Sequence, residues 1–312
     1  MRVFVTGASG WIGSAVVPEL ITAGHQVLGL ARSDASAAAL TAAGADVRRG
    51  TLDDLDGLRA AADASDGVVH LAFKHDLVHA GDFQGAADAD RRAIEAFGEA
   101  LAGSDRPFVI ASGLAGLVPG RTATERDGHE PGPASASGGL RTRHASAELV
   151  LSFGARGIRS SIVRLAPTVH GDGDPGFMAA IVRIARERGV SGYRGDGANR
   201  WPAVHRLDAA HLFRLAVEHA PAGSTLHAVG DEGVPIRAVA EVIGRHLGLP
   251  VAAVPDEAAA EHFGFLAGLL AVDSPASSAI TRELLGWRPT HRGLVEDLER
   301  GHYFRPARSA VA

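Results

Sequence analysis

The sequence predicts an α/β fold, in which a doubly wound parallel sheet is followed by a small, mainly helical C-terminal cap. Short strand-like runs alternate with alanine-rich stretches of helical pattern over the first half of the chain, which is typical of βαβ units. A glycine-rich turn joins the first run to the first helix. After His170 the rhythm breaks at the turn-rich segment GDGDPGF, and helices predominate beyond it.

Six strands and five helices are expected before this break. The expected strands are Arg2–Thr6, Gln26–Ala31, Asp46–Arg49, Gly67–Leu71, Phe108–Ala111 and Ser161–Leu165. The expected helices are Gly13–Ala23, Ala35–Ala43, Leu55–Ala62, Asp88–Leu101 and Arg143–Phe153, and Pro119–Gly139 is expected to be a loop. Residues 1–170 therefore form the predicted sheet domain.

Residues 171–312 form the predicted cap, with one return of the chain to the sheet around residues 203–230. Its expected helices are Phe177–Arg188, Asp208–Glu218, Ile236–Leu247, Asp256–Leu270 and Ser277–Leu285, and Gly189–Trp201 is expected to be a loop.

The composition excludes several classes of protein. The 312 residues are 46% hydrophobic and 21% charged, as in a globular protein, and the net charge of -5 argues against a nucleic-acid partner. The absence of cysteine excludes disulfides and thiolate chemistry. The chain starts directly with a predicted strand, which leaves no room for a signal peptide, and its longest apolar run (residues 263–272) is too short to span a bilayer. We therefore expect a cytoplasmic protein with no membrane partner.

The segment TGASGWIG (residues 6–13) predicts a dinucleotide-binding turn of the Rossmann type, because it follows a predicted strand and opens a predicted helix. Gly7 permits the tight turn, Gly10 lets the backbone approach a pyrophosphate, and Gly13 packs helix on strand. The helix start then offers free N–H groups to the phosphates. The expected contacts are Gly7, Ser9, Gly10, Trp11, Ile12 and Gly13. The spacing is G-x-x-G-x-x-G rather than G-x-G-x-x-G, so an ordinary turn is the alternative.

The end of the second strand bears on the choice of cofactor. NAD-binding sites place an acidic residue there for the ribose hydroxyls, whereas an arginine suits the 2′-phosphate of NADP. The sequence reads LARSD, which places Arg32 and Ser33 at this point, so NADP(H) is favoured over NAD(H). Asp34 would serve an NAD ribose if the strand ended later.

Four motifs together resemble the extended short-chain dehydrogenase/reductase family, whose members include NAD(P)-dependent epimerases and dehydratases. They are TGASGWIG, HLAF (residues 70–73), VRLAPTVHG (residues 163–171) and AVHRLDAAHL (residues 203–212), and they span nearly the whole chain. The resemblance implies a small-molecule substrate and a homodimer. It also implies further cofactor contacts: Leu52 and Asp53 beside the adenine, Leu71, Ala72 and Phe73 beside the cofactor, and Pro167, Thr168 and Val169 near the nicotinamide.

The catalytic Tyr-x-x-x-Lys dyad that the resemblance implies is absent from this sequence. Its slots fall on Leu140 and His144, or on the residues one position earlier. The chain has only two tyrosines, Tyr193 and Tyr303, and neither is followed by a lysine four residues on. The family's strand-five serine matches Ser112 or its neighbour Gly113, and Ser112 could equally satisfy a backbone group at the strand end. The chain is thus an atypical member.

Other side chains are candidates for the proton donor. Lys74 and His75 follow strand four directly, and Lys74 is the one lysine among 31 lysines and arginines. A desolvated lysine beside a cationic nicotinamide can release a proton, although an arginine-rich composition also leaves one lysine by chance. His144 occupies the lysine slot and suits acid–base work, or is a surface residue. No metal is expected, because His75 and His79 lack a third ligand at a clear spacing.

The substrate side of the site is less defined. The resemblance places His170 near the substrate mouth, while Tyr193 and Trp201 are candidates to line an apolar pocket or to form the core of the cap. We expect NADPH-dependent reduction of a small apolar carbonyl, enone or imine. The alternatives are a sugar-type epimerase or isomerase that retains its cofactor, and a non-catalytic NADP-binding sensor.

Overall fold

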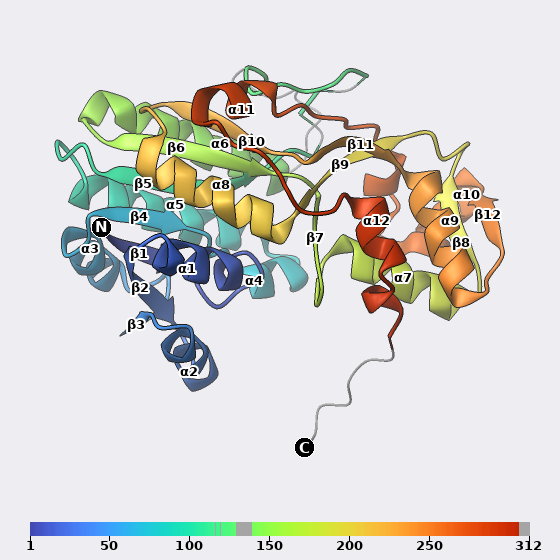
Figure 1. Ribbon diagram of the computed structural model, residues 1–312, viewed down its shortest axis with the longest axis horizontal. Coiled ribbons are helices and arrows are strands. Elements are labelled where there is room, and N and C mark those ends of the chain that lie inside the picture. Colours follow the sequence, from blue (N-terminus) through green and yellow to red (C-terminus); the bar gives the residue numbers. More distant parts are fainter. Residues whose placement is uncertain (116, 119, 129–138, 306–312) are drawn as a thin grey trace.

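A seven-stranded parallel sheet forms the centre of the molecule (Figure 1), with the strand order β10-β6-β5-β4-β1-β2-β3. In this computed structural model the described residues are 1–115, 117–118, 120–128 and 139–305, and for residues 79 and 139–143 only the backbone is described. The strands are β1 (Arg2–Thr6), β2 (Gln26–Ala31), β3 (Asp46–Arg49), β4 (Gly67–His70), β5 (Pro107–Gly113), β6 (Arg159–Leu165) and β10 (Ser224–Ala228).

Helices cover both faces of this sheet, as the predicted doubly wound fold requires. On one face α1 (Gly13–Thr22) packs against α8 (Arg206–His219), and α2 (Asp34–Ala42) lies on β2 and β3. On the other face lie α3 (Leu55–Asp63), α5 (Phe83–Ala100) and α6 (Gly139–Ser152). Figure 1 shows α1 and α8 in front of the sheet and α5 and α6 behind it. The predicted fold class is confirmed.

Short polar caps start several helices directly after the strands. Ser33 accepts a hydrogen bond from the Ser36 N–H at 3.2 Å, and Asp54 accepts one from the Gly57 N–H at 3.0 Å. Such caps satisfy backbone donors that a helix start leaves unpaired. Because α1, α2 and α3 begin soon after β1, β2 and β3, short loops line this part of the carboxyl edge of the sheet, where open α/β sheets bind their ligands.

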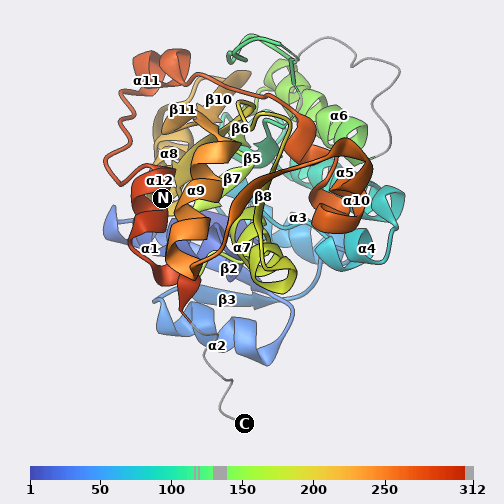
Figure 2. The same ribbon diagram turned by 90° about the vertical axis from the view of Figure 1, so that its right-hand side faces the viewer.

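The cap has its own apolar core, distinct from the two cores of the sheet domain. Its helices are α7 (Phe177–Arg188), α9 (Ile236–Leu247), α10 (Asp256–Phe263) and α12 (Leu294–Glu299), which face the viewer in Figure 2. Two small sheets complete it: β11 (Asp231–Pro235), β9 (Arg200–His205) and β7 (Thr168–His170) form one, and β12 (Val251–Val254) and β8 (Ser191–Arg194) the other. The segment α11 (Ala279–Leu285) packs beside β10 and α8.

After β9 the chain leaves the cap and returns to the sheet domain. Helix α8 packs against α1, and β10 then pairs in parallel with β6, for example Leu226 with Val163. Residues 206–228 therefore contribute a helix and an edge strand to the sheet layer.

Several predicted elements differ from the structure. Helix α5 begins at Phe83 instead of Asp88, because the Asp82 side chain accepts from the Gly85 N–H at 2.8 Å. The predicted loop Gly189–Trp201 contains β8 and the start of β9, and the predicted helix Asp256–Leu270 breaks at Gly264, where φ is +56°. The short elements α4 (His75–His79), β7 and α12 were not predicted. Most of the predicted loop Pro119–Gly139 lies outside the described residues.

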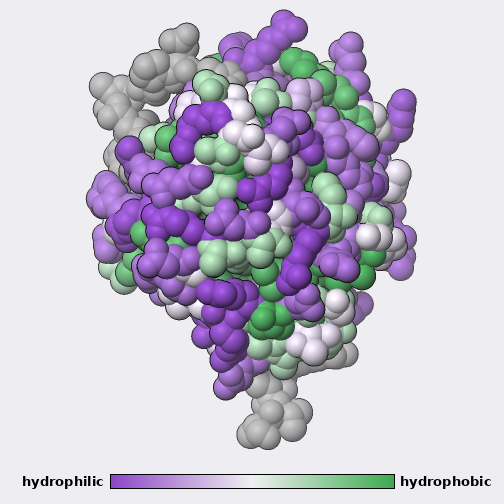
Figure 3. Space-filling view, turned by 90° about the vertical axis from the view of Figure 1, so that its left-hand side faces the viewer, coloured by the Kyte–Doolittle hydropathy of each residue, from purple (hydrophilic) through white to green (hydrophobic). Residues whose placement is uncertain are grey.

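The surface is mixed in character. Figure 3 shows the end of the sheet domain, where hydrophilic side chains are spread among hydrophobic ones. Within the described part of the chain, no helix combines the length and the apolar character needed to cross a membrane.

Candidate functional site

The glycine turn between β1 and α1 is packed so tightly that side chains would not fit at two of its positions. Gly7 has a φ of +65°, and a Cβ there would lie 2.7 Å from the Ala72 nitrogen at the end of β4. A Cβ on Gly13 would lie 2.1 Å from the Gly7 carbonyl oxygen. A Cβ on Gly10 would meet only the Gly7 oxygen, at 3.2 Å, so no described side chain fills the space above the turn. This cradle fits the pyrophosphate of a dinucleotide.

A buried polar network fixes the strand end beside this turn. Thr6 Oγ1 lies 2.7 Å from His70 Nδ1 and accepts a hydrogen bond from the Ala72 N–H at 3.2 Å, and His70 Nε2 lies 3.1 Å from Asp90 Oδ1. All three side chains are buried. The contacts are satisfied when Thr6 donates to Nδ1 and Nε2–H donates to Asp90. The network holds Leu71, Ala72 and Phe73 in place. Sequence analysis missed it, although polar residues at two buried strand ends were the available signal.

The end of β2 has a cationic character. Ala31 is buried, Arg32 is exposed, and the Ser33 side chain is used as the cap of α2. Arg49, at the end of β3, donates to the Ser33 carbonyl oxygen and to the Asp34 carboxylate. Among the described residues no carboxylate forms an ion pair with Arg32. The acidic residue that could have served an NAD ribose is thus already held by an arginine.

Two predicted site residues from different loops form an ion pair with each other. Lys74 Nζ lies 2.7 Å from both carboxylate oxygens of Asp53, the residue that the resemblance places beside the adenine. Leu52 next to it is buried. The structure therefore does not give Lys74 the desolvated setting that a proton-donating lysine needs. His75 begins α4, is exposed, and lies edge-on to the Phe73 ring with 5.5 Å between the ring centroids.

Polar residues form a row across the carboxyl ends of three strands. Ser112 on β5 is paired with Arg164 on β6, which is paired with His227 on β10, so their side chains lie on the same face of the sheet. Ser112 is 5% exposed, and the other two are fully buried. Arg164 donates to the carbonyl oxygens of Asp127 at 2.6 Å and Gly128 at 3.3 Å. Burial lowers the pKa of both Arg164 and His227, that of His227 to about 4.

His144 on α6 faces this row. A Cβ built on Gly128 would lie 3.2 Å from His144 Nε2 and 3.3 Å from an Arg164 guanidinium nitrogen, so both groups meet at Gly128. The structure therefore brings Ser112 and His144, two of the predicted catalytic residues, to the same end of the sheet. Arg164, which joins them, was missed by sequence analysis. The signal was a charged residue inside a strand that otherwise reads as buried.

The remaining predicted cofactor contacts, Pro167, Thr168 and Val169, lie just before β7 and within it. The Trp11 indole N–H donates to the Val169 carbonyl oxygen at 2.9 Å, which ties the glycine turn to this strand. Pro167 and Val169 are partly exposed, whereas Thr168 is buried. The prediction that His170 contacts the substrate is wrong for this structure, because its side chain is fully buried and Nδ1 lies 2.9 Å from Asp297 Oδ2 on α12.

The aromatic residues assigned to the substrate belong to the cap. Trp201 is 1% exposed, packs against Phe177, and lies with its indole nitrogen 3.3 Å from the Val272 carbonyl oxygen. Tyr193 packs against the same core beneath Arg237. The assignment of Trp201 to the substrate pocket is therefore wrong, since it is buried in the core of the cap, whereas the assignment of the partly exposed Tyr193 stays a prediction. For Trp201 the alternative of a place in the core holds.

The second tyrosine, Tyr303, also lies in the cap. Its hydroxyl donates to Asp174 Oδ2 at 2.7 Å, and burial together with this carboxylate raises the pKa of Tyr303 far above its usual value. Tyr303 is therefore held as the neutral phenol. Neither tyrosine restores the missing dyad.

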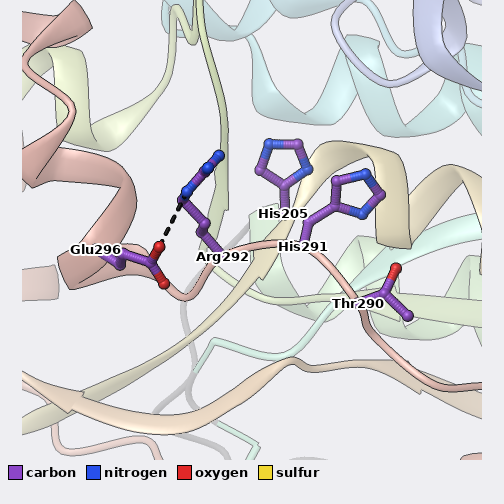
Figure 4. A pocket seen from close by; sticks show the side chains of 5 residues that line it. All are labelled: His205, Thr290, His291, Arg292 and Glu296. Atoms are coloured by element: carbon purple, nitrogen blue, oxygen red, sulfur yellow. Dashed lines mark ion pairs between the residues drawn. The ribbon is translucent and has the colours of Figure 1, made fainter.

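A hollow of about 380 Å³ lies where the cap meets the sheet domain (Figure 4). It is lined by His205, Thr290, His291, Arg292 and Glu296. The rings of His205 and His291 are stacked with 4.7 Å between centroids, and His291 Nδ1 lies 2.8 Å from Asp208 Oδ1. Burial is the main cause that lowers the pKa of His205 to about 4, with the nearby His170 and His291 adding to it. In the described chain no group of three or more His, Cys, Asp or Glu side chains could hold a metal ion.

Comparisons with known proteins agree with this geometry. The model of the family described as "NAD dependent epimerase/dehydratase family" matches residues 3–229. An uncharacterized protein of Schizosaccharomyces pombe is 48% identical over 305 residues, which are 97% of this chain and 100% of that protein. A 4-hydroxy-2-methyl-3-oxo-4-farnesyl-3,4-dihydroquinoline-1-oxide ketoreductase of Stigmatella aurantiaca is 28% identical over 85% of this chain and 80% of its own. The crystal structure of UDP-glucose 4-epimerase from Thermotoga maritima has a TM-score of 0.75 at 20% identity, covering 97% and 98% of the two chains.

Proposed function

Because the chain belongs to the NAD dependent epimerase/dehydratase family, we propose that it is an NADPH-dependent reductase of a small apolar carbonyl, enone or imine. The observation that carries the cofactor preference is the end of β2, where Arg49 holds the Asp34 carboxylate and Arg32 is left exposed without an acidic partner among the described residues. An arginine at this position would pair with a 2′-phosphate through charge-assisted hydrogen bonds.

The residues around the glycine turn would hold this cofactor. The N–H groups of Trp11, Ile12 and Gly13 would face the pyrophosphate, Asp53 and Leu52 would lie on the adenine side, and Pro167 and Val169 would lie on the nicotinamide side. When bound, the cofactor supplies a hydride to the electrophilic carbon of the substrate. What the protein itself must supply is orientation of the substrate and a proton for the oxygen or nitrogen that becomes negative.

His144 is the proposed proton donor, in the absence of the family's tyrosine. It lies on α6 and meets Arg164 at Gly128, at the same strand ends as Ser112. The Ser112 hydroxyl would orient the reacting carbonyl, and Arg164 would position the segment that His144 packs against through its bonds to residues 127 and 128. The Stigmatella relative is described as a ketoreductase, which supports reduction of a carbonyl.

The test is NADPH consumption by the purified protein against a panel of ketones, enones and imines, alongside Arg32→Ala and His144→Gln. We expect turnover with at least one apolar substrate and a faster rate with NADPH than with NADH. Arg32→Ala should reduce the preference for NADPH over NADH roughly tenfold or more, as expected for a lost charge-assisted contact. His144→Gln should lower turnover while leaving NADPH affinity unchanged.

Two outcomes would contradict the proposal. An unchanged cofactor preference in Arg32→Ala would contradict the assignment of NADPH. Full turnover in His144→Gln would contradict the assignment of His144 as the proton donor. A cofactor that survives purification and does not exchange would instead favour an epimerase that oxidises and re-reduces its substrate. The observation in favour of this second candidate function is the similarity in fold to the Thermotoga epimerase.

A further inference from the structure

Arg206, the first residue of α8, lies against the glycine turn. The centre of its guanidinium group is 4.3 Å from the centroid of the Trp11 ring. The ring is itself fixed, because its N–H donates to the Val169 carbonyl oxygen at 2.9 Å. A cation over the face of an indole is held by the ring quadrupole. The guanidinium is therefore held on the ring of Trp11, a residue of the glycine turn.

The aliphatic part of the Arg206 side chain crosses the end of β7. Gly171 has a φ of +147°, and a Cβ built on it would lie 3.5 Å from Arg206 Cγ and 3.7 Å from Cδ. This glycine follows directly after β7, whose Val169 lies on the nicotinamide side of the site. Arg206 thus packs between the end of β7 and the Trp11 ring of the glycine turn.

Among the described residues Arg206 forms no ion pair, whereas nearby arginines are paired. Arg214 on the same helix pairs with Glu19 and Glu218, and Arg292 pairs with Glu296. Within the described ranges no carboxylate lies at ion-pair distance from Arg206, whose guanidinium group stacks on the Trp11 ring.

The acidic residue in the same helical turn does not compensate for this charge. Asp208 accepts hydrogen bonds from the backbone N–H groups of Thr290 and His291, and one of its oxygens lies 2.8 Å from the His291 ring. Its carboxylate is therefore committed to residues 290 and 291. A cation that is partly exposed, held in place beside a phosphate-binding turn and without an ion pair among the described residues has the properties of an anion-binding group.

We propose that Arg206 is a cofactor-anchoring residue that binds the phosphate on the nicotinamide side of the pyrophosphate, with the Trp11 ring as its support. The inference rests on the family's use of a nicotinamide dinucleotide and does not depend on the preference for NADPH, since NADH carries the same pyrophosphate.

The experiment compares two ligands that differ in this phosphate. NADPH contains it, while adenosine 2′,5′-bisphosphate has the adenine, the 2′-phosphate and only the adenine-side 5′-phosphate. Dissociation constants of both are measured by calorimetry for the wild type and for Arg206→Ala. We expect Arg206→Ala to weaken NADPH roughly tenfold and to leave the bisphosphate unchanged, because a charge-assisted bond to one phosphate is lost. Arg206→Lys should recover part of the loss. The dissociation constant of NADH is measured in parallel. Because NADH carries the same pyrophosphate, the role of Arg206 can be tested even if the protein does not prefer NADPH.

Arg237→Ala is the matched control, because Arg237 also lies over an aromatic ring, that of Tyr193 at 5.5 Å, but in the cap. It should change neither affinity. An equal loss for both ligands in Arg206→Ala would mean a general effect on the fold and would overturn the proposal. Unchanged NADPH affinity would also overturn it, and would point to an anionic group of the substrate as the partner of Arg206. A weaker salt dependence of NADPH binding in Arg206→Ala supports the proposal, since one fewer cation would meet the phosphates.

Discussion

Lys74 and Asp53 tie together the loops that follow β4 and β3, with the lysine Nζ 2.7 Å from both carboxylate oxygens. The two strands are separated in the sheet by β1 and β2, so the ion pair bridges two loops that are not neighbours at this edge. Because its ammonium group is held in this ion pair, we propose a role in cofactor binding for Lys74 in place of a role in proton transfer.

The Lys74–Asp53 pair yields a first prediction. Because both side chains are partly exposed, the pair should contribute no more than about 1 kcal/mol. We expect Lys74→Ala and Asp53→Asn each to weaken cofactor binding by up to roughly fivefold, and to leave turnover at saturating cofactor unchanged. Steady-state kinetics over a range of cofactor concentrations check this. A collapse of turnover in Lys74→Ala at saturation would return Lys74 to the role of proton donor.

Gly13 should not tolerate a side chain. A Cβ there would lie 2.1 Å from the Gly7 oxygen and 2.7 Å from the backbone of Ala8, so the turn must move to admit it. We expect Gly13→Ala to lower the melting temperature and to reduce cofactor affinity roughly tenfold or more. Gly268→Ala is the control, because Gly268 has an ordinary φ of -67° and open space around it. Equal melting temperatures and cofactor affinities of the two variants would mean that the glycine turn tolerates a side chain at position 13.

A substitution of Trp201 distinguishes a structural role of this side chain from a role in substrate binding. Its side chain is 1% exposed, so Trp201→Phe removes buried volume and the contact to the Val272 carbonyl. We expect the free energy of unfolding to fall by about 1–3 kcal/mol, measured by urea denaturation. The KM for the substrate should stay the same. A raised KM in a variant of unchanged stability would restore Trp201 to the substrate pocket.

The buried histidines predict how stability depends on pH. Burial lowers the pKa of His227 and of His205 to about 4, whereas an unfolded histidine titrates near 6.5. Between these values the unfolded chain binds more protons, so the free energy of unfolding is fully retained above about pH 6.5 and decreases as the pH falls toward 4. The slope should reach up to about 1.4 kcal/mol per pH unit for the buried His227 and less for the half-buried His205.

His205→Asn offers a clean test of this dependence. The His205 ring accepts the Leu207 N–H at the start of α8, and asparagine can serve as the same cap without titrating. Urea unfolding at pH 7 and at pH 5 should therefore show a smaller loss of stability for the variant than for the wild type. The same loss in both proteins would assign the pH dependence to other groups.

Sequence alone determined the parts of this protein that depend on local pattern. The glycine turn, the strands β1, β2 and β3, and the helices α7 and α9 have the predicted bounds, because hydrophobic period and turn residues act over a few positions. The missing dyad at residues 140 and 144 could likewise be read from spacing, as could the arginine that follows β2.

The tertiary structure decided which side chains face the site. Lys74 was expected at the nicotinamide, but it forms an ion pair with Asp53 in the loop after β3. His170 and Trp201 were expected at the substrate, but burial against α12 and in the core of the cap removed them. Arg164 and Arg206 are placed near the site only by their neighbours, Ser112 on the adjacent strand and Trp11 in the glycine turn. Such pairings depend on long-range packing, since strand order and helix placement bring together residues that no local pattern connects.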